Sequence, residues 1–297
     1  GECMKYKTNG EKIFEVFNYM FLTATAVLCI VPVLNLLAVS FSSTAAISAG
    51  KVGIWPVDFN TQAYKYLADN SAFLHAMGIS AKRLVLGVAI NMLLCILTAY
   101  PLSKDKDKFK RRNFFANYLV ITMLIGGGLI PTYMIVSETG LINSIWALIL
   151  PTAVPVYNVI LLQNFYRGIP TELEEAAFID GAGIWRTLWS IYVPLSKPAL
   201  ASILLFIAVD HWNAWFDGLI YMNDISKYPL QSYLQTIIVE ESLLANKSAK
   251  EMELFMKVSA RNLNAAQVFV AMIPIVIVYP FLQKYFTSGL VLGSVKG

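Results

Sequence analysis

Long apolar stretches divide the chain into blocks that are separated by short groups of charged residues. Five stretches contain no Asp, Glu, Lys or Arg: residues 16–50, 84–103, 113–137, 139–166 and 262–283. A helix needs about 20 such residues to cross a bilayer core of about 30 Å, so each stretch can hold one crossing. A sixth apolar stretch, 199–222, is interrupted only by Asp210, His211 and Asp217. The pattern therefore predicts six membrane spans.

The spans are predicted to be helices, because lipid offers no partner to an unpaired backbone group and the strict alternation of barrel strands is absent. The predicted fold class is thus an all-α membrane protein with six transmembrane helices. The helices are expected at 14–41, 80–103, 114–136, 142–166 and 199–222, with the sixth from 262 onwards. Together they form one six-helix domain over 14–286, between an N-terminal segment, 1–13, and a C-terminal tail, 287–297.

Basic residues orient these helices. The densest cluster lies between the second and third spans and comprises Lys104, Lys106, Lys108, Lys110, Arg111 and Arg112. Lys and Arg are enriched in cytoplasmic loops, so this loop, the segment 167–198 and both termini are predicted to be cytoplasmic. The segments 42–78 and 223–261 are then extracytoplasmic.

The composition supports a membrane protein rather than a soluble enzyme. Only 14% of the 297 residues are charged, whereas an ordinary soluble domain carries about 25% Asp, Glu, Lys and Arg. The mean hydropathy of +0.59 leaves room for polar loops between the apolar spans. A net charge of +4 is too weak and too dispersed to indicate a nucleic-acid partner, so the predicted contacts are with membrane lipid.

No catalytic or metal site is predicted. Cys3, Cys29 and Cys95 form neither a disulfide framework nor a metal-ligand spacing. The sequence contains no GxxxxGK[ST], HExxH or GxSxG motif. No cleavable signal peptide is evident, so the first span is expected to stay in the mature protein. Whether Gly1, Glu2 and Cys3, which precede Met4, are native stays open.

The segment between the fourth and fifth spans reads IPTELEEAAFIDGAGIWRTLWSIYVPLSKPAL. Thr171 and Glu174 have the spacing of a capping box, and acidic residues suit the positive end of a helix. A helix is therefore predicted to begin near Glu172 and to stop at the glycine-rich turn 180–183. A second amphipathic helix, 184–192, is predicted to end before Pro194. Such a rigid helix pair is suited to docking in a groove of another protein.

This segment resembles the EAA loop of permease subunits of binding-protein-dependent ABC importers. The family pattern is EAA, three residues, Gly, nine residues and then Ile-x-Leu-Pro, and it is matched here by Glu175-Ala176-Ala177, Gly181, Ile191 and Pro194. Only Val193 departs from it, in place of the usual Leu. The tracts LEEAAFIDGAG and GLVLGSVKG resemble the carbohydrate branch, similar to the smaller maltose permease subunit. The tracts EKIFEVFNYMFL, GGGLIPTYMIV and HWNAWFDGLIYM resemble the subgroup called LplC or YtcP.

The resemblance implies a type I ABC importer permease fold and a role in oligosaccharide import across a bacterial cell (inner) membrane. The chain would form half of a heterodimeric pore with a second homologous permease. Its other partners would be an extracytoplasmic solute-binding protein and an ATPase dimer that uses ATP and magnesium, while this chain would hold no cofactor. The residues implied in ATPase coupling are Glu174, Glu175, Ala176, Ala177, Asp180 and Gly181. In the tail, Ser294 and Lys296 are either a further ATPase contact or part of a frayed terminus.

Polar residues mark the fifth span. Asp210, Asn213 and Asp217 are spaced to share one face of a continuous helix, and carboxylates within a membrane face the protein interior or water. One interpretation is that these residues, with Trp212 and Trp215, line the sugar pathway. The other is that the Asp and Asn side chains tie the helix to its neighbours, while the tryptophans pack or belong to an interfacial belt.

Two further questions stay open. Gly126, Gly127, Gly128, Pro131, Pro151 and Pro155 in the third and fourth spans indicate either a hinge or close helix packing. The external residues Tyr228, Tyr233, Glu240, Glu241 and Lys247 belong either to a docking surface for the binding protein or to a solvated loop. A rival function is a proton-coupled secondary transporter that uses Asp210 and Asp217, although the internal repeats usual in such folds are not evident.

Overall fold

The computed structural model describes residues 9–239 and 260–294, and within these ranges it contains helices and no strand. The α-helices are α1 (Asn9–Ser40), α2 (Thr44–Ser48), α3 (Gln62–Asp69), α4 (Ser71–Ser103), α5 (Arg112–Leu124), α6 (Leu129–Glu138), α7 (Val156–Arg167), α8 (Thr171–Ile179), α9 (Ile184–Thr187), α10 (Val193–Leu195), α11 (Lys197–Asn213), α12 (Phe216–Tyr221), α13 (Leu230–Val239) and α15 (Ala260–Ser294). Four short segments of other helical type are η1 (Ile145–Leu148), η2 (Leu150–Thr152), η3 (Leu188–Tyr192) and η4 (Ile225–Lys227). The all-helical fold class is confirmed.

Five of the six apolar stretches correspond to long helices or bent pairs, while the stretch 199–222 contains most of α11 and all of α12. By length and composition, α1, α4 and residues 261–278 of α15 can each cross a membrane. The bent pairs are α5 with α6 (113°), η1–η2 with α7 (47°), and the segment 184–195 with α11 (82°). The described part of the chain therefore has three candidate spans, or up to six if each bent pair is one span.

The third and fourth predicted spans are each interrupted by a bend. The chain leaves the helical path at 125–128, where Gly128 adopts a φ of +83° that favours glycine. Gly126 and Gly128 have no neighbouring atom within 4 Å of an added Cβ, so these glycines serve a bend rather than close packing. In the fourth span, the break at 153–155 ends with Pro155 immediately before α7.

The chain divides into two compact units, residues 1–70 with 240–271 and residues 71–239 with 272–297. In the first unit, Asn262 fastens the start of α15 to the C-terminal end of α1. Its amide nitrogen donates to the carbonyl oxygens of Val39, Ser40 and Ser42 at 2.8, 3.2 and 3.1 Å. The last carbonyl oxygens of a helix have no partner within the helix, so the hydrogen bonds that the buried Asn262 amide donates to them stabilise the end of α1.

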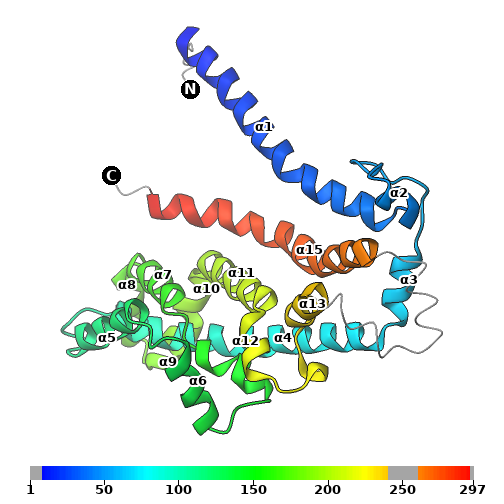
Figure 1. Cartoon of the computed structure of the whole chain (residues 1–297). Helices are drawn as coiled ribbons and strands as arrows, with labels where there is room; N and C mark the ends of the chain where they lie inside the picture. The colour runs from blue at the N-terminus through cyan, green and yellow to red at the C-terminus, as the bar shows by residue number, and fades with distance from the viewer. Residues whose placement is uncertain (1–8, 240–259, 295–297) are drawn as a thin grey trace. The chain divides into compact units, whose positions relative to one another are not determined.

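The second unit is built on α4, which packs against α7 and α11 (Figure 1). Its core consists of buried side chains from these helices, from η3 and from the connection after α7: Cys95, Ile96, Ala99, Tyr100, Leu102, Val159, Leu162, Tyr166, Ile169, Leu188, Tyr192, Ile203 and Ile207. Three of the rings, Tyr100, Tyr166 and Tyr192, meet edge to face with centroids 4.9–6.4 Å apart. Such contacts stabilise aromatic clusters beyond the burial of their surface.

A polar contact lies inside this apolar packing. The amide nitrogen of Asn91 on α4 lies 3.2 Å from His211 Nε2 on α11 and donates to the Thr152 carbonyl oxygen at 3.2 Å. The His211 ring sits against Gly87, one turn earlier on α4, where an added Cβ would overlap the ring atoms. The absence of a side chain at Gly87 therefore allows α11 to approach α4.

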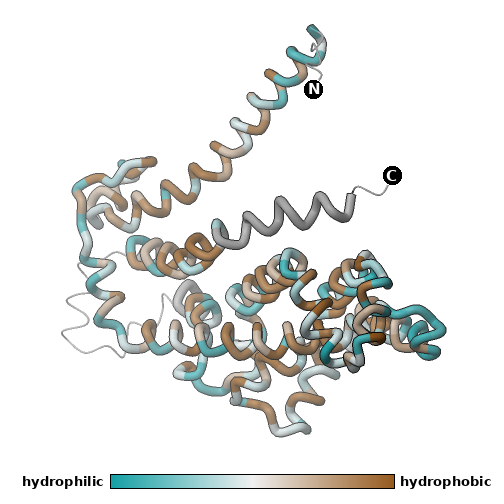
Figure 2. The backbone as a smooth tube through the Cα atoms, turned by 180° about the vertical axis from the view of Figure 1, so that it is seen from behind, coloured by the Kyte–Doolittle hydropathy of each residue, from teal (hydrophilic) through white to brown (hydrophobic). Residues whose placement is uncertain are grey.

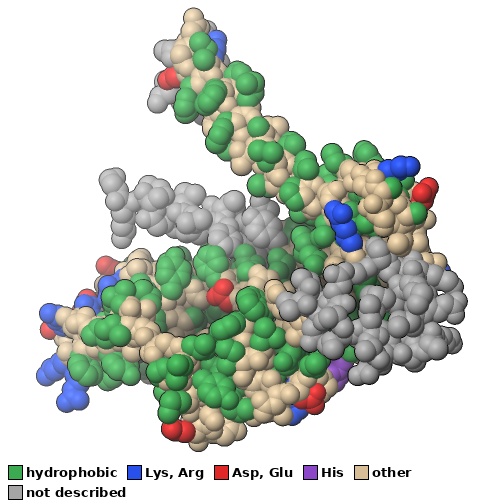
Figure 3. All heavy atoms as spheres, viewed as in Figure 1, with side chains coloured by type: hydrophobic (Ala, Val, Ile, Leu, Met, Phe, Trp, Pro, Cys, Tyr) green, Lys and Arg blue, Asp and Glu red, His purple; other side chains and the backbone are tan. Residues whose placement is uncertain are grey.

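Apolar surface remains exposed on both units, while the charged side chains are concentrated in loops. Figure 2 shows the hydrophilic connection between α4 and α5, and Figure 3 shows basic side chains gathered there, beside helices covered by hydrophobic side chains. In α1, large side chains such as Phe14, Phe17 and Leu28 are 62–73% exposed. Exposed apolar surface of this extent marks contact with lipid or with another protein.

Replacing Gly87 with Ala is expected to destabilise the second unit, since the new methyl group would overlap the His211 ring. Overpacking of this kind costs about 1–3 kcal/mol, which a thermal unfolding measurement on the detergent-solubilised protein would detect. Gly78→Ala on the same helix is the matched control, because nothing lies within 4 Å of that position. Adding His211→Ala to Gly87→Ala should restore much of the loss. Equal melting of the Gly87→Ala and Gly78→Ala variants would contradict this account.

Candidate functional site

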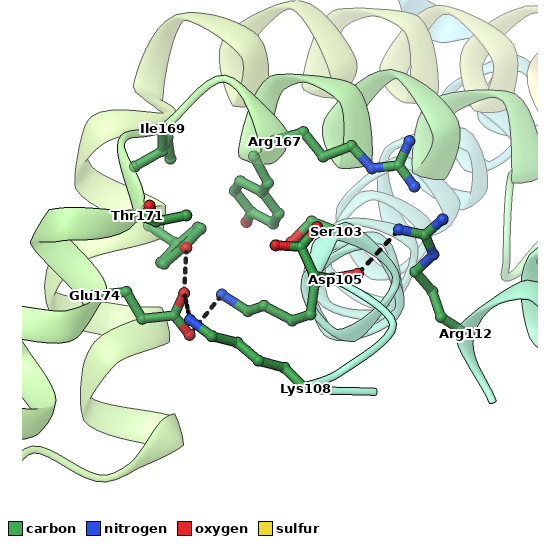
Figure 4. A pocket seen from close by; sticks show the side chains of 11 residues that line it. Ser103, Asp105, Lys108, Arg112, Arg167, Ile169, Thr171 and Glu174 are labelled. Atoms are coloured by element: carbon green, nitrogen blue, oxygen red, sulfur yellow. Dashed lines mark hydrogen bonds and ion pairs between the residues drawn. The ribbon is translucent and has the colours of Figure 1, made fainter. Parts of the chain in front are cut away.

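A charged cavity of about 300 Å³ lies at the C-terminal end of α4, where it meets α7, α8 and η3 (Figure 4). Its lining residues are Ser103, Lys104, Asp105, Lys108, Arg112, Tyr166, Arg167, Ile169, Thr171, Glu174 and Tyr192. Two arginines complete the end of α4, since Arg167 donates to the Leu102 carbonyl and Arg112 to the Lys104 carbonyl at 3.4 and 3.2 Å. Positively charged side chains at a helix C-terminus are stabilised by the negative end of the helix dipole.

Glu174 is the centre of the cavity wall. Its side chain is 3% exposed although it lies in the first turn of α8. Lys104 Nζ lies 3.1 Å from Glu174 Oε1, and Lys108 Nζ lies 3.4 Å from Oε2. The Tyr192 hydroxyl donates to Oε2 at 3.1 Å. One carboxylate therefore connects α8 to the end of α4 and to η3.

Aromatic rings hold Lys104 in place. Its Nζ lies 3.9 Å from the ring centroids of both Tyr100 and Tyr192. A cation over a ring face is attracted by the ring's electron density, and the attraction is larger where water is excluded. Lys104 is thus fixed between two tyrosines with its charge aimed at Glu174, as Figure 4 shows for the carboxylate and the two lysines that reach it.

The pKa values of this pair follow from burial and from the pairing. Burial raises the pKa of the Glu174 carboxyl, but the hydrogen bonds and charges of Lys104, Tyr192 and Lys108 outweigh burial and leave the pKa below its ordinary value. For Lys104, burial lowers the pKa more than Glu174 raises it, so its pKa lies below that of a solvated lysine. The pairing thus favours the carboxylate form of Glu174, whereas burial disfavours the ammonium form of Lys104.

The prediction of a capping box at Thr171 was wrong. Thr171 is the first residue of α8, Pro170 precedes it, and no side chain caps the helix. The reason is the position of Glu174, whose carboxylate is engaged by two lysines and a tyrosine and is directed away from the helix start. The predicted stop is confirmed: α8 ends at Ile179, and Gly181 has a φ of +76°.

The outer surface of α8 carries the other residues of the motif. Glu175, Ala176, Asp180 and Gly181 are exposed, whereas Ala177 is 8% exposed. Large apolar side chains surround them: Phe178, Ile179, Ile184 and Trp185 are 42–86% exposed. We call the exposed surface of 175–185 the α8 surface. It combines apolar area with few charges, which is the composition of a protein contact.

The second predicted helix does not end before Pro194. Helical structure runs from α9 through the π-helical turn η3 and α10 to Leu195. Pro194 lies in α10, directly after the π-helical turn η3, within this continuous run. In this helix pair, Ala177 and Leu188 are buried, while Leu173, Ala176, Trp185 and Trp189 are exposed.

The polar residues of the fifth span do not lie on one helix face. α11 ends at Asn213, the chain turns at Ala214, and Asp217 lies in α12. The expectation assumed one continuous helix and was wrong on this point. Asp210, Asn213 and Trp215 are exposed, whereas Trp212 is 5% exposed. The exposed candidates for the sugar pathway, Asp210, Asn213 and Trp215, therefore lie at and just after the end of α11, whereas Asp217 lies in α12.

Asp217 pairs with Arg83, a residue that the sequence analysis did not single out. Arg83 is 2% exposed and forms two hydrogen bonds with the Asp217 carboxylate, one of them between Nη1 and Oδ1 at 3.1 Å. Its guanidinium also donates to the carbonyl oxygens of Ala214 and Leu148, each at 3.3 Å. The available signal was the position of Arg83 directly before the apolar stretch 84–103, where an ionisable residue needs a partner.

Some of the other candidate residues fall outside the described part. Tyr228 is half-buried and Tyr233 is buried, while Glu240, Glu241, Lys247 and Lys296 lie outside the described residues. Ser294 is the last residue of α15, and its side chain is not described. No group of three or more His, Cys, Asp or Glu side chains able to hold a metal occurs in 9–239 and 260–294.

Comparison with known proteins identifies the class. No family model matches the sequence. The chain is 38% identical over 292 residues to Protein LplC of Bacillus subtilis (strain 168), covering 98% of each chain. It is also 38% identical over 286 residues to the polygalacturonan/rhamnogalacturonan transport system permease protein YtcP of the same organism, covering 96% of this chain and 99% of that protein.

A solved structure shows the same fold. The chain matches one chain of a bacterial ABC transporter involved in the import of the acidic polysaccharide alginate, with a TM-score of 0.87 and 30% identity, over 95% of this chain and 100% of that one. A multi-pass membrane protein with this fold is a permease subunit of an ABC importer. This chain belongs to the carbohydrate ABC transporter permeases, and its resemblance to LplC and YtcP is confirmed.

Replacing Glu174 with Gln should lower the thermal stability of the protein, because Lys104 would keep a charge without its carboxylate partner. Leaving a buried group unpaired costs on the order of 2 kcal/mol. Glu172→Gln, an exposed residue in the same turn, is the control. The double variant with Lys104→Gln should recover part of the loss. Equal unfolding midpoints for Glu174→Gln and Glu172→Gln would rule out a stabilising pair.

The same pair predicts a pH dependence. A lowered carboxyl pKa contributes stability that is present above the ordinary value of 4.5 and is lost as pH falls through the folded-state pKa. The unfolding midpoint of the wild type should therefore fall more steeply below pH 4.5 than that of Glu174→Gln. Parallel pH profiles for the two proteins would contradict this expectation.

Proposed function

We propose that this chain is one of two homologous permease subunits in an ATP-driven importer of oligosaccharides, and that the α8 surface contacts a partner ATPase. The observation that carries the proposal is that the two sides of α8 have different contacts. Glu174 points inward and fixes the helix to α4, while Glu175, Ala176 and Gly181 are presented outward. A helix that is held rigidly on one side and exposes apolar surface on the other can transmit a displacement from a bound protein to α4.

The named relatives support the oligosaccharide part of the proposal. YtcP is named for polygalacturonan and rhamnogalacturonan transport, and another relative, MelC of Bacillus subtilis (strain 168), is named for melibiose, raffinose and stachyose import. The solved transporter imports alginate. These substrates are all chains of sugar units, although they differ in length and charge.

The remaining partners follow from this assignment. The permease itself is not catalytic, and ATP with magnesium is used by the ATPase dimer. An extracytoplasmic solute-binding protein delivers the sugar, and the second permease completes the pore. The basic α4–α5 connection supports a cytoplasmic position, at the bacterial cell (inner) membrane, for the α8 surface and both termini.

Proton coupling through Asp210 and Asp217 gains no support from the contacts. Asp217 is engaged by Arg83 through two hydrogen bonds and is therefore part of a structural contact between α4 and α12. The relatives YtcP and MelC are named as permease proteins, and neither name states a proton-driven carrier. The ATP-driven importer therefore explains more of the structure.

The test is uptake of labelled oligosaccharides by proteoliposomes that hold this chain with its partner subunits and ATP, in the presence of the binding protein. Phe178→Asp should reduce ATP-dependent uptake at least about tenfold, since a charge in the centre of a docked apolar patch costs more than 1.4 kcal/mol. Glu138→Ala, an exposed residue at the end of α6, is the control and should leave uptake unchanged.

Two results would contradict the proposal. One is normal ATP-dependent uptake by a Phe178→Asp protein that is still incorporated and folded. The other is uptake that a protonophore abolishes while ATP is maintained, which would favour the secondary transporter.

A further inference from the structure

A second cavity, of about 500 Å³, lies toward the opposite end of α4 from Glu174. Four of its lining residues, His75, Gly78, Ile79 and Lys82, follow one face of α4, and Asn143, Met222 and Lys227 are among those that close it. Lys82 precedes Lys104 by 22 residues, or about 33 Å at the rise of an α-helix. This separation matches the thickness of a bilayer core, so the two cavities belong to opposite membrane faces.

The second cavity offers positive charge. Lys82, Lys227 and His75 all line it with exposed side chains, and no Asp or Glu is among its described lining residues. Lys227 is held in position because its Nζ donates to the Asn143 carbonyl oxygen at 3.2 Å. The nearby Asp224 is directed to the backbone, where it accepts the Ser226 N–H at 2.8 Å. Two ammonium groups are thus available to a negatively charged ligand.

Asn143 adds an unused hydrogen-bond acceptor. Its backbone adopts a φ of +61°, which is uncommon for a residue other than glycine, and its N–H donates to the Tyr221 carbonyl oxygen at 2.8 Å. The side-chain Oδ1 is buried and has no hydrogen-bond partner within the described structure. Because an unsatisfied buried acceptor costs free energy, a turn of the Asn143 side chain that brings Oδ1 to a ligand hydroxyl in the cavity would gain a hydrogen bond.

We propose that this cavity binds an acidic sugar unit, with the carboxylate of a uronate on Lys82 and Lys227 and a ring hydroxyl on Asn143 Oδ1. The inference rests on the proposed function and narrows its substrate class. The volume lies within the range of small-molecule sites, and Ile79, Ile145 and Met222 supply apolar area for the C–H face of a sugar ring. A protein partner instead buries an extended surface of about 800 Å² per side, so a concave cavity suits a saccharide better.

The experiment uses the complete complex of this chain with its partner subunits, held in nanodiscs without the binding protein. Trigalacturonate and trimannuronate are titrated, together with their methyl esters, which keep the shape and lose the charge. We expect at least one acid to bind, its ester to bind at least about tenfold more weakly, and Lys82→Gln with Lys227→Gln to cause a similar loss. Asn143→Asp should also weaken binding, because aspartate tolerates the positive φ of this position but its negative charge repels a carboxylate.

Lys65→Gln is the matched control, because Lys65 is an exposed lysine of α3 outside the cavity and should not matter. The proposal is overturned if neither acid binds, if the esters bind as tightly as the acids, or if the double lysine variant binds like the wild type. If any of these results is accompanied by ATP-driven uptake of neutral oligosaccharides, only the uronate site is refuted and the proposed importer function is retained. If no oligosaccharide is taken up with ATP, the proposed function itself is refuted.

Discussion

The ion pair between Glu174 and Lys104 is the contact on which the position of α8 in this permease depends. Without it, α8 would be a short helix of 9 residues, which has little stability of its own in water. The pair binds the first turn of α8 to the end of the 33-residue α4, and Tyr192 extends the connection into η3. The short helix thereby gains the rigidity of the long one.

The long helix can serve as this support because of the small and polar residues on one of its faces. Arg83, Gly87, Asn91, Cys95 and Ala99 are spaced by four and are all buried. Gly87 and Ala99 allow close approach, while Arg83 and Asn91 form directed hydrogen bonds to the helices that pack there. In lipid, where apolar burial between helices provides little net gain, packing and hydrogen bonds of this kind determine which helices associate.

The sequence was sufficient for the helical class, for the apolar segments and for the start and stop of α8, because each depends on local composition or on a glycine turn. It was not sufficient for the interruptions at 125–128 and at Ala214, since the same apolar residues can fill a straight or a broken helix. The direction of Glu174 could not be foreseen either. Its neighbour Lys104 is 70 residues away in the chain, and only the packing of α8 against α4 brings the two charges together. The pairing of Arg83 with Asp217 escaped for the same reason.

The central claim is that the α8 surface is the side of the permease that meets the ATPase, while the inward side holds the helix to α4. Site-specific photo-crosslinking in the assembled complex tests this most directly, with the photoreactive residue placed at Phe178, which is 42% exposed, or at Leu188, which is 1% exposed. The account predicts a covalent adduct with the ATPase from position 178 and none from position 188. No adduct from position 178 in an intact complex would contradict it.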